Sequence, residues 1–223
     1  MQRNKNERGN VLVFVLIGVV LFAALAFTVA RGFRSEGTSN LTKRELDLSV
    51  SDTLDYTQRL QRAVDRLRQR GCSESEISFE NTTVSGYSFS TRDECKVFHP
   101  DGGSLAYTPP ASISTSGYWF FTGLNGIEGS INGQYVGTEK ADLVVFLRVS
   151  RDACVALNSR LNISNPGNVP PVEIDGFVNT DTDAQKFKGT FTDGNALTIA
   201  NAYISGCVNY SNNYYFYSAL VVR

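Results

Sequence analysis

Apolar residues gather first in one uninterrupted block. Val11 to Ala30 contains no charged residue. About 20 apolar residues at 1.5 Å rise per residue span roughly 30 Å, the thickness of the hydrocarbon core of a bilayer. A single segment crosses lipid as a helix because lipid offers no partner to open backbone groups. The pattern therefore predicts a transmembrane helix over residues 10–31, behind a basic leader over residues 1–9.

Two other interpretations of the apolar block remain open. A basic start followed by the small residues of Ala24-Leu25-Ala26 is typical of a cleaved secretory signal peptide. The apolar run continues past that site through Phe27 and Val29, which favours an uncleaved segment. A buried helix of a soluble protein is disfavoured by the uniform apolarity of the run.

The spacing becomes helical and amphipathic downstream. Apolar residues recur at steps of three, four and six, and charged residues lie between them. This spacing predicts an amphipathic stalk helix over residues 32–71. The stripe consists of Leu46, Val50, Leu54, Leu60, Val64 and Leu67. Gly71 is the expected C-cap. The basic run from Arg59 to Arg70 is interpreted as a solvated helix face in preference to a patch for anionic lipid or nucleic acid.

From Cys72 onward the pattern favours β structure. Period-two or short apolar runs predict strands near residues 77–80, 83–89, 95–98, 118–122 and 143–147. Residues 152–161 indicate a short helix, and residues 197–203 fit either a helix or a strand. The last segment, 214–223, is apolar on both faces, so we expect it between two other strands. The predicted fold is α+β: a long N-terminal helix, transmembrane then amphipathic, followed by a mainly antiparallel β domain over residues 72–223.

Composition and cysteine content narrow the class of protein. Charged residues make up 19% and the net charge is −1, which argues against a nucleic-acid partner. The four cysteines, Cys72, Cys95, Cys154 and Cys207, all follow the apolar block and match no zinc or redox motif. An even number favours disulfides in an oxidising compartment. Of three possible pairings, Cys72–Cys95 with Cys154–Cys207 needs the least chain crossing, and four reduced thiols are the alternative.

These features predict a location. Basic residues flank the apolar block on both sides, so charge alone does not orient it. The cysteines place the C-terminal domain outside the cytoplasm. We expect a single-pass protein of the bacterial inner membrane, with that domain in the periplasm or in a cell-surface filament.

Motifs for catalysis are missing from the sequence. It has no G-x-S-x-G, P-loop or H-E-x-x-H pattern, and its single histidine, His99, begins the turn-forming run His99-Pro-Asp-Gly. No enzyme activity and no cofactor are therefore predicted. Asn179, Asp181 and Asp183 alternate like calcium ligands but lack the glycine and closing glutamate of an EF-hand. They are weak calcium candidates, and a solvated loop is favoured.

A group of aromatic residues is a second candidate for a binding site. They could form a surface that stacks on a glycan or binds a protein, although core packing is the commoner role. The residues are Tyr118, Trp119, Tyr210, Tyr214, Tyr215 and Tyr217.

The N-terminal segment resembles a type IV pilin or pseudopilin. The resemblance is carried by Arg8-Gly9-Asn10 followed by Val-Leu-Val-Phe-Val-Leu-Ile. It implies processing by a dedicated peptidase between Gly9 and Asn10. The cysteine regions around Cys154 and Gly206-Cys207 are similar to those of type IVb pilins. The same N-terminal segment also resembles uncharacterised bacterial membrane proteins that have Gly-Asn-Val-Leu starts.

Two positions depart from the pilin pattern. Phe14 stands where a major pilin has Glu, and Asn10 stands where the mature chain usually begins with Phe or Met. Minor pseudopilins at a filament tip also lack that Glu. The resemblance therefore implies a non-enzymatic, minor or tip subunit of a type IV pilus or type II secretion pseudopilus, whose partners are the lipid bilayer and other pilin-like subunits. The alternative is an anchored or secreted binding module for a surface glycan or protein that does not polymerise.

Overall fold

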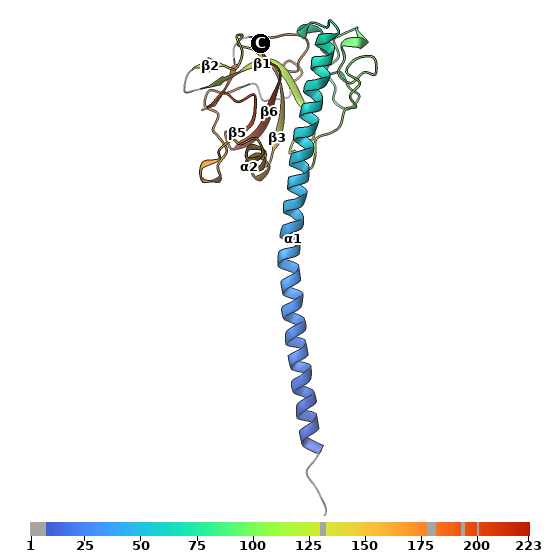
Figure 1. Cartoon of the computed structure of the whole chain (residues 1–223), viewed down its shortest axis with the longest axis vertical. Helices are drawn as coiled ribbons and strands as arrows, with labels where there is room; N and C mark the ends of the chain where they lie inside the picture. Colours follow the sequence, from blue (N-terminus) through green and yellow to red (C-terminus); the bar gives the residue numbers. More distant parts are fainter. Residues whose placement is uncertain (1–7, 130–132, 178–181, 193–194, 200) are drawn as a thin grey trace, which may run out of the picture. The chain divides into compact units, whose positions relative to one another are not determined.

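The chain forms two compact units, Met1–Glu45 and Leu46–Arg223. The computed structural model describes the backbone of residues 8–129, 133–177, 182–192, 195–199 and 201–223. Within the first helix, α1 (Arg8–Gln69), side chains are described for residues 13–23 and from residue 42 onward. Figure 1 shows α1 and the strands of the second unit.

The transmembrane part of the predicted fold is wrong. The described apolar side chains of the first unit run from Val13 to Ala23. Across the described residues, no helix combines the length and apolarity that a membrane span requires. The rest of the predicted span, residues 10–12 and 24–31, lies outside the described side chains. The same finding overturns the prediction of a single-pass protein of the bacterial inner membrane.

The amphipathic stripe packs into the core of the second unit, as predicted. Val50, Leu60, Val64 and Leu67 are fully buried, and the two other stripe residues are partly buried against the same cluster. This face is apolar at helical spacing, so it buries a continuous strip of side chains against the sheet.

Helix α1 ends in a glycine turn. Gly71 has φ of 92°, a left-handed conformation that favours glycine. Its N–H donates to the Arg68 carbonyl at 3.0 Å, and the Cys72 N–H donates to the Leu67 carbonyl at 3.1 Å. This pair of bonds is a Schellman motif, which satisfies two carbonyls at the helix end. The predicted C-cap at Gly71 is confirmed.

Within the described residues, six strands form a sheet at the centre of the second unit (Figure 1). Its strand order is β2-β1-β3-β6-β5, with neighbours antiparallel, and β4 pairs with β1 in parallel. The strands are β1 (Phe120–Gly129), β2 (Gln134–Tyr135), β3 (Asp142–Val149), β4 (Asn195–Ile199), β5 (Ser205–Tyr210) and β6 (Asn213–Val221). Strand β6 lies between β3 and β5, so the prediction for the last segment is confirmed.

Both faces of the sheet are covered. Successive residues of β3 alternate between two hydrophobic clusters: Leu143, Val145 and Leu147 belong to the larger one, and Val144 and Phe146 belong to the smaller one. Because side chains alternate along a strand, a strand with two buried faces needs a continuous apolar run. The apolar run in β3 therefore reflects a central position in the sheet.

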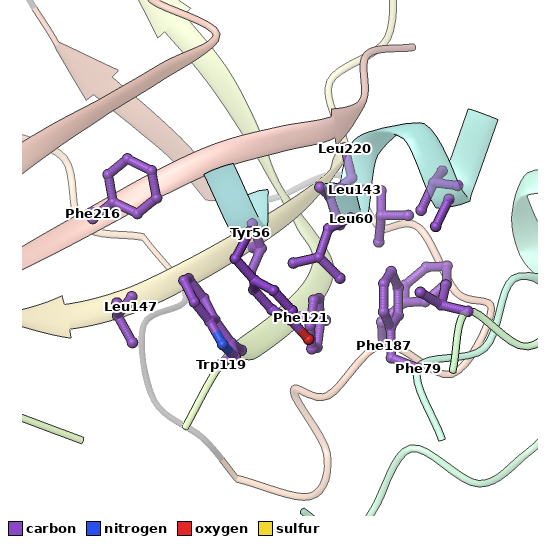
Figure 2. Close-up of a cluster of buried hydrophobic side chains, with 14 of the residues drawn as sticks. Tyr56, Leu60, Phe79, Trp119, Phe121, Leu143, Leu147, Phe187, Phe216 and Leu220 are labelled. Atoms are coloured by element: carbon purple, nitrogen blue, oxygen red, sulfur yellow. The ribbon is translucent and has the colours of Figure 1, made fainter. Parts of the chain in front are cut away.

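The larger cluster joins α1, α2 (Arg151–Arg160) and one face of the sheet. Figure 2 shows its aromatic centre. Tyr56 of α1 stacks on Trp119 with ring centroids 5.3 Å apart, and Phe79 stacks on Phe121 at 4.0 Å. Burial of these large rings ties the helix and the following loops to the sheet.

The segment between α1 and β1 contains no strand within its described residues. The predicted strands at 77–80, 83–89 and 95–98 are wrong. Two short 3₁₀ helices, Glu74–Glu76 and Asp93–Cys95, and one isolated bridge between Ser78 and Lys96 take their place. The alternating apolar residues there insert into the aromatic cluster and do not form a ladder. A third 3₁₀ helix, Pro166–Asn168, follows α2.

The remaining predicted elements have counterparts. The segments 118–122 and 143–147 fall largely within β1 and β3, and the predicted helix at 152–161 corresponds to α2. The ambiguous segment at 197–203 contributes to strand β4, which ends at Ile199.

Candidate functional site

Two disulfides fix the second unit. Cys72 bonds to Cys95 with Cα atoms 5.8 Å apart, and Cys154 bonds to Cys207 with Cα atoms 5.3 Å apart. This is the pairing of sequence neighbours, and none of the four cysteines is free. Disulfides persist in oxidising compartments, which is consistent with an extracytoplasmic protein.

The first disulfide supports one wall of a pocket. Cys95 is followed by a bridge to Ser78, in which the Ser78 N–H donates to the Cys95 carbonyl at 3.0 Å and the Val97 N–H donates to the Ser78 carbonyl at 2.9 Å. Lys96 lies between these bonds, so its backbone is fixed on both sides. The disulfide and the bridge together hold the strand-like segment that carries Lys96.

A tight turn follows at residues 99–104. The Gly103 N–H donates to the Lys96 carbonyl at 2.9 Å, and the Gly102 N–H donates to the His99 carbonyl at 3.0 Å. A Cβ at Gly102 would lie 2.1 Å from the Lys96 carbonyl oxygen, so only glycine permits this approach. The prediction of a turn at His99 is confirmed.

Two arginines near the end of α1 bind the same turn: Arg66 lies in the helix, and Arg70 follows its last residue. Arg66 donates to the Gly103 carbonyl at 2.7 Å, and Arg70 donates to the Gly102 carbonyl at 3.0 Å. Residues four apart share one helix face, so both side chains reach the same loop. These arginines of the basic run therefore have a structural role.

Charged side chains meet beside a pocket. The Lys96 ammonium contacts Glu80 at 2.9 Å and Asp93 at 2.7 Å, and its side chain is only 17% exposed. Hydrogen bonds from Lys96 lower the pKa of both carboxyls, and those two partners raise the pKa of Lys96. All three groups therefore remain charged around neutral pH.

The pocket that Lys96 and Glu80 help to line has a volume of about 380 Å³. Two aromatic side chains line it: Phe98 and Tyr107 pack edge to face, with centroids 5.3 Å apart and planes at 84°. The rest of the lining is polar or charged and consists of Glu80, Asn81, Thr82, Thr83, Lys96 and His99. Aromatic walls with a few fixed polar groups are typical of small-ligand sites.

His99 offers a donor to this pocket. Its Nδ1 accepts from the Asp101 backbone N–H at 3.3 Å, so the proton of the neutral ring is carried by Nε2. Nε2 lies 3.8 Å from the Asp93 carboxylate, beyond hydrogen-bond distance. Within the described residues, no nucleophile is brought to His99 that would form a catalytic pair.

The predicted aromatic surface is mostly core. Trp119 and Tyr217 are almost fully buried, and Tyr215 packs against Phe177 at 5.3 Å. Burial raises the pKa of Tyr217, whose hydroxyl donates to the Tyr203 carbonyl at 3.1 Å. Core packing therefore explains these residues, and a common stacking surface for a glycan is not formed by them.

The weak calcium candidates are only partly described. Asp183 pairs with Lys188 at 3.0 Å, which lowers the pKa of the carboxyl. Asn179 and Asp181 lie outside the described residues. The part of the chain that the structure describes contains no group of three acidic, histidine or cysteine side chains placed to hold a metal ion.

Gly9 and Asn10 lie in the first turn of α1, just after Arg8. The structure gives their backbone only, and processing between them stays a prediction.

Sequence reasoning missed the pocket itself. Glu80 and Lys96 lie in different segments of the chain, which are joined by the Ser78–Lys96 bridge and by the Cys72–Cys95 bond. The Gly102-Gly103 pair after His99 was the one local signal of a closely packed turn.

Comparisons of this chain with family models, curated proteins and solved structures give no match. The pilin resemblance therefore remains a resemblance of the N-terminal segment and a basis for proposals.

Proposed function

We propose that the protein is a structural, non-enzymatic, pilin-like subunit, with a minor or tip role in an extracytoplasmic filament. The apolar segment Val13–Phe22 would pack against the corresponding segment of neighbouring subunits. The second unit would be presented as a disulfide-bonded head.

The exposure of the apolar segment carries this proposal. Every large apolar residue from Val13 to Phe22 is between 49% and 76% exposed. Burying one such side chain is worth roughly 1.5–3 kcal/mol, so nine of them in water are a strong drive toward association. A Cβ at Gly18 would meet nothing within 4 Å, so one side of the segment is open to a close neighbour.

Cysteine cross-linking tests whether these segments meet. All four native cysteines are disulfide-bonded, so Val15→Cys adds the only free thiol. Mild oxidation of the full chain in detergent-free buffer should give a disulfide-linked dimer on a non-reducing gel. Thr115→Cys, at an exposed position of the head, is the matched control and should remain monomeric.

A charged residue placed in the apolar segment gives a second test of assembly. Val15→Asp should shift the sedimenting species from an assembly to a monomer, because an aspartate cannot be buried unpaired. A Val15→Cys chain that stays monomeric, or a Val15→Asp chain that assembles like the wild type, refutes the proposal. Mature protein that begins at Asn10 would add support for pilin-type processing.

The second candidate is a secreted binding module that does not polymerise. The pocket beside Lys96 favours it, because small-ligand sites combine aromatic walls with a few fixed polar groups. A monodisperse monomer in both cysteine variants would favour this candidate.

A further inference from the structure

The charged groups beside the pocket are already paired. Lys96 contributes one positive charge, and Glu80 and Asp93 contribute one negative charge each within 2.9 Å of the ammonium, so the three groups have a net charge of −1. The ion pairs satisfy one another, so a strongly charged ligand would gain little and would have to break them. This favours an uncharged ligand.

The same groups are suited to hydroxyls. An ammonium has three donors, and two of those of Lys96 are taken by carboxylates. The His99 Nε2–H adds another donor, and the exposed hydroxyls of Thr82 and Thr83 both donate and accept. A ligand rich in hydroxyl groups can therefore donate and accept within one small volume.

Two aromatic side chains line the same pocket. Phe98 and Tyr107 are half-buried, and Phe98 is anchored by Phe79 and Phe121 at centroid distances of 6.4 and 6.3 Å. A ring fixed in this way offers a rigid apolar surface that loses little entropy when a ligand packs on it. Sugar rings combine an apolar C–H face with a rim of hydroxyls, and that combination matches the aromatic and polar side chains that line the pocket.

The site is also preorganised. The Cys72–Cys95 bond, the Ser78–Lys96 bridge and the Gly102-Gly103 turn hold its backbone without a ligand. Asn81 closes the loop on the other side, since its Oδ1 accepts from the Thr83 and Val84 N–H groups at 2.9 and 2.7 Å.

We propose that the pocket formed by Glu80, Lys96, Phe98, His99 and Tyr107 binds a neutral saccharide. Its volume of about 380 Å³ suits one or two sugar rings. The site lies within the second unit, so the inference holds whether or not the chain assembles through Val13–Phe22.

Saturation-transfer NMR on the disulfide-bonded full chain tests this binding. The probes are lactose, maltose and chitobiose, each at about 10 mM, a concentration suited to millimolar dissociation constants. At least one probe should receive saturation from the wild-type protein. Thr82→Arg places a long side chain over the pocket and should abolish that transfer, whereas the matched control Thr115→Arg should retain it.

Two further variants keep the test decisive. Thr83→Arg replaces Thr82→Arg if the latter loses its near-ultraviolet circular dichroism. His99→Ala should weaken binding about fivefold, because it removes one donor. The inference is overturned if no neutral probe receives saturation, if transfer persists in a folded pocket-blocked variant, or if only the charged controls glucosamine and N-acetylneuraminic acid bind. Loss of sugar binding with intact Val15→Cys cross-linking would leave the filament proposal standing.

Discussion

Asn158 protects the edge of the sheet, and its replacement is a sharp test of the structure. This side chain of α2 is fully buried. Its Nδ2 donates to the Cys207 carbonyl at 2.8 Å, and its Oδ1 accepts from the Cys207 N–H at 2.8 Å. The amide therefore takes the place of a neighbouring strand along the outer side of β5.

The expected cost follows from the groups left behind. Asn158→Leu keeps the size of the side chain but leaves both backbone groups of Cys207 buried without a partner, since that residue is 1% exposed. A buried unsatisfied polar group costs about 1–3 kcal/mol. Two such groups predict a loss of about 3 kcal/mol in the free energy of unfolding.

Urea unfolding of the oxidised protein measures this loss. With a slope of about 2 kcal/mol per molar urea, the midpoint should fall by about 1.5 M. Asn195→Leu, at an exposed position of β4, is the matched control and should change stability by less than about 0.5 kcal/mol. If both variants unfold at the wild-type midpoint, Asn158 does not cap the strand.

Two further predictions concern protonation and the disulfides. Burial raises the pKa of Glu173 above 4.5 despite three backbone N–H donors, so the folded state keeps this proton to higher pH than the unfolded state. The contribution of protonated Glu173 to stability is complete below about pH 4.5 and is lost as pH rises through the raised pKa. The free energy of unfolding of Glu173→Gln should lack this decline. Parallel pH profiles of stability for the wild type and the variant would contradict a raised pKa at Glu173. Mass spectrometry without reductant should detect no alkylatable thiol. Replacing Cys154 and Cys207 by Ala should lower the free energy of unfolding by about 4 kcal/mol, and replacing Cys72 and Cys95 should lower it by about 3 kcal/mol. The first loss is larger because the Cys154–Cys207 bond closes the longer loop and so restricts the unfolded chain more. Four labelled thiols in native protein, or equal losses in the two double variants, would contradict this account.

Local periodicity predicted the elements whose pattern repeats over several turns or faces. The stripe from Val50 to Leu67 marks a buried helix face because its spacing persists for five turns. The run in β6 marks a strand with two neighbours because both of its faces are apolar.

Shorter patterns misled where long-range packing decides. Phe79 and Tyr87 alternate with polar residues like strand positions, yet both insert into the aromatic cluster and their segments form no ladder. The apolar block predicted a transmembrane helix from composition, whereas no helix among the described residues has the length and apolarity of a membrane span. The pocket depends on contacts between Glu80 and Lys96 that no local pattern encodes.

The order of the disulfides has a consequence for biogenesis. Cys72 and Cys95 are 23 residues apart, and the second pair, separated by 53 residues, begins only after the first is complete. A chain that emerges N-terminus first can therefore oxidise each cysteine with the next one to appear. Simple sequential oxidation yields the native connectivity, so maturation of this protein should need an oxidant and no isomerase to reshuffle mispaired bonds.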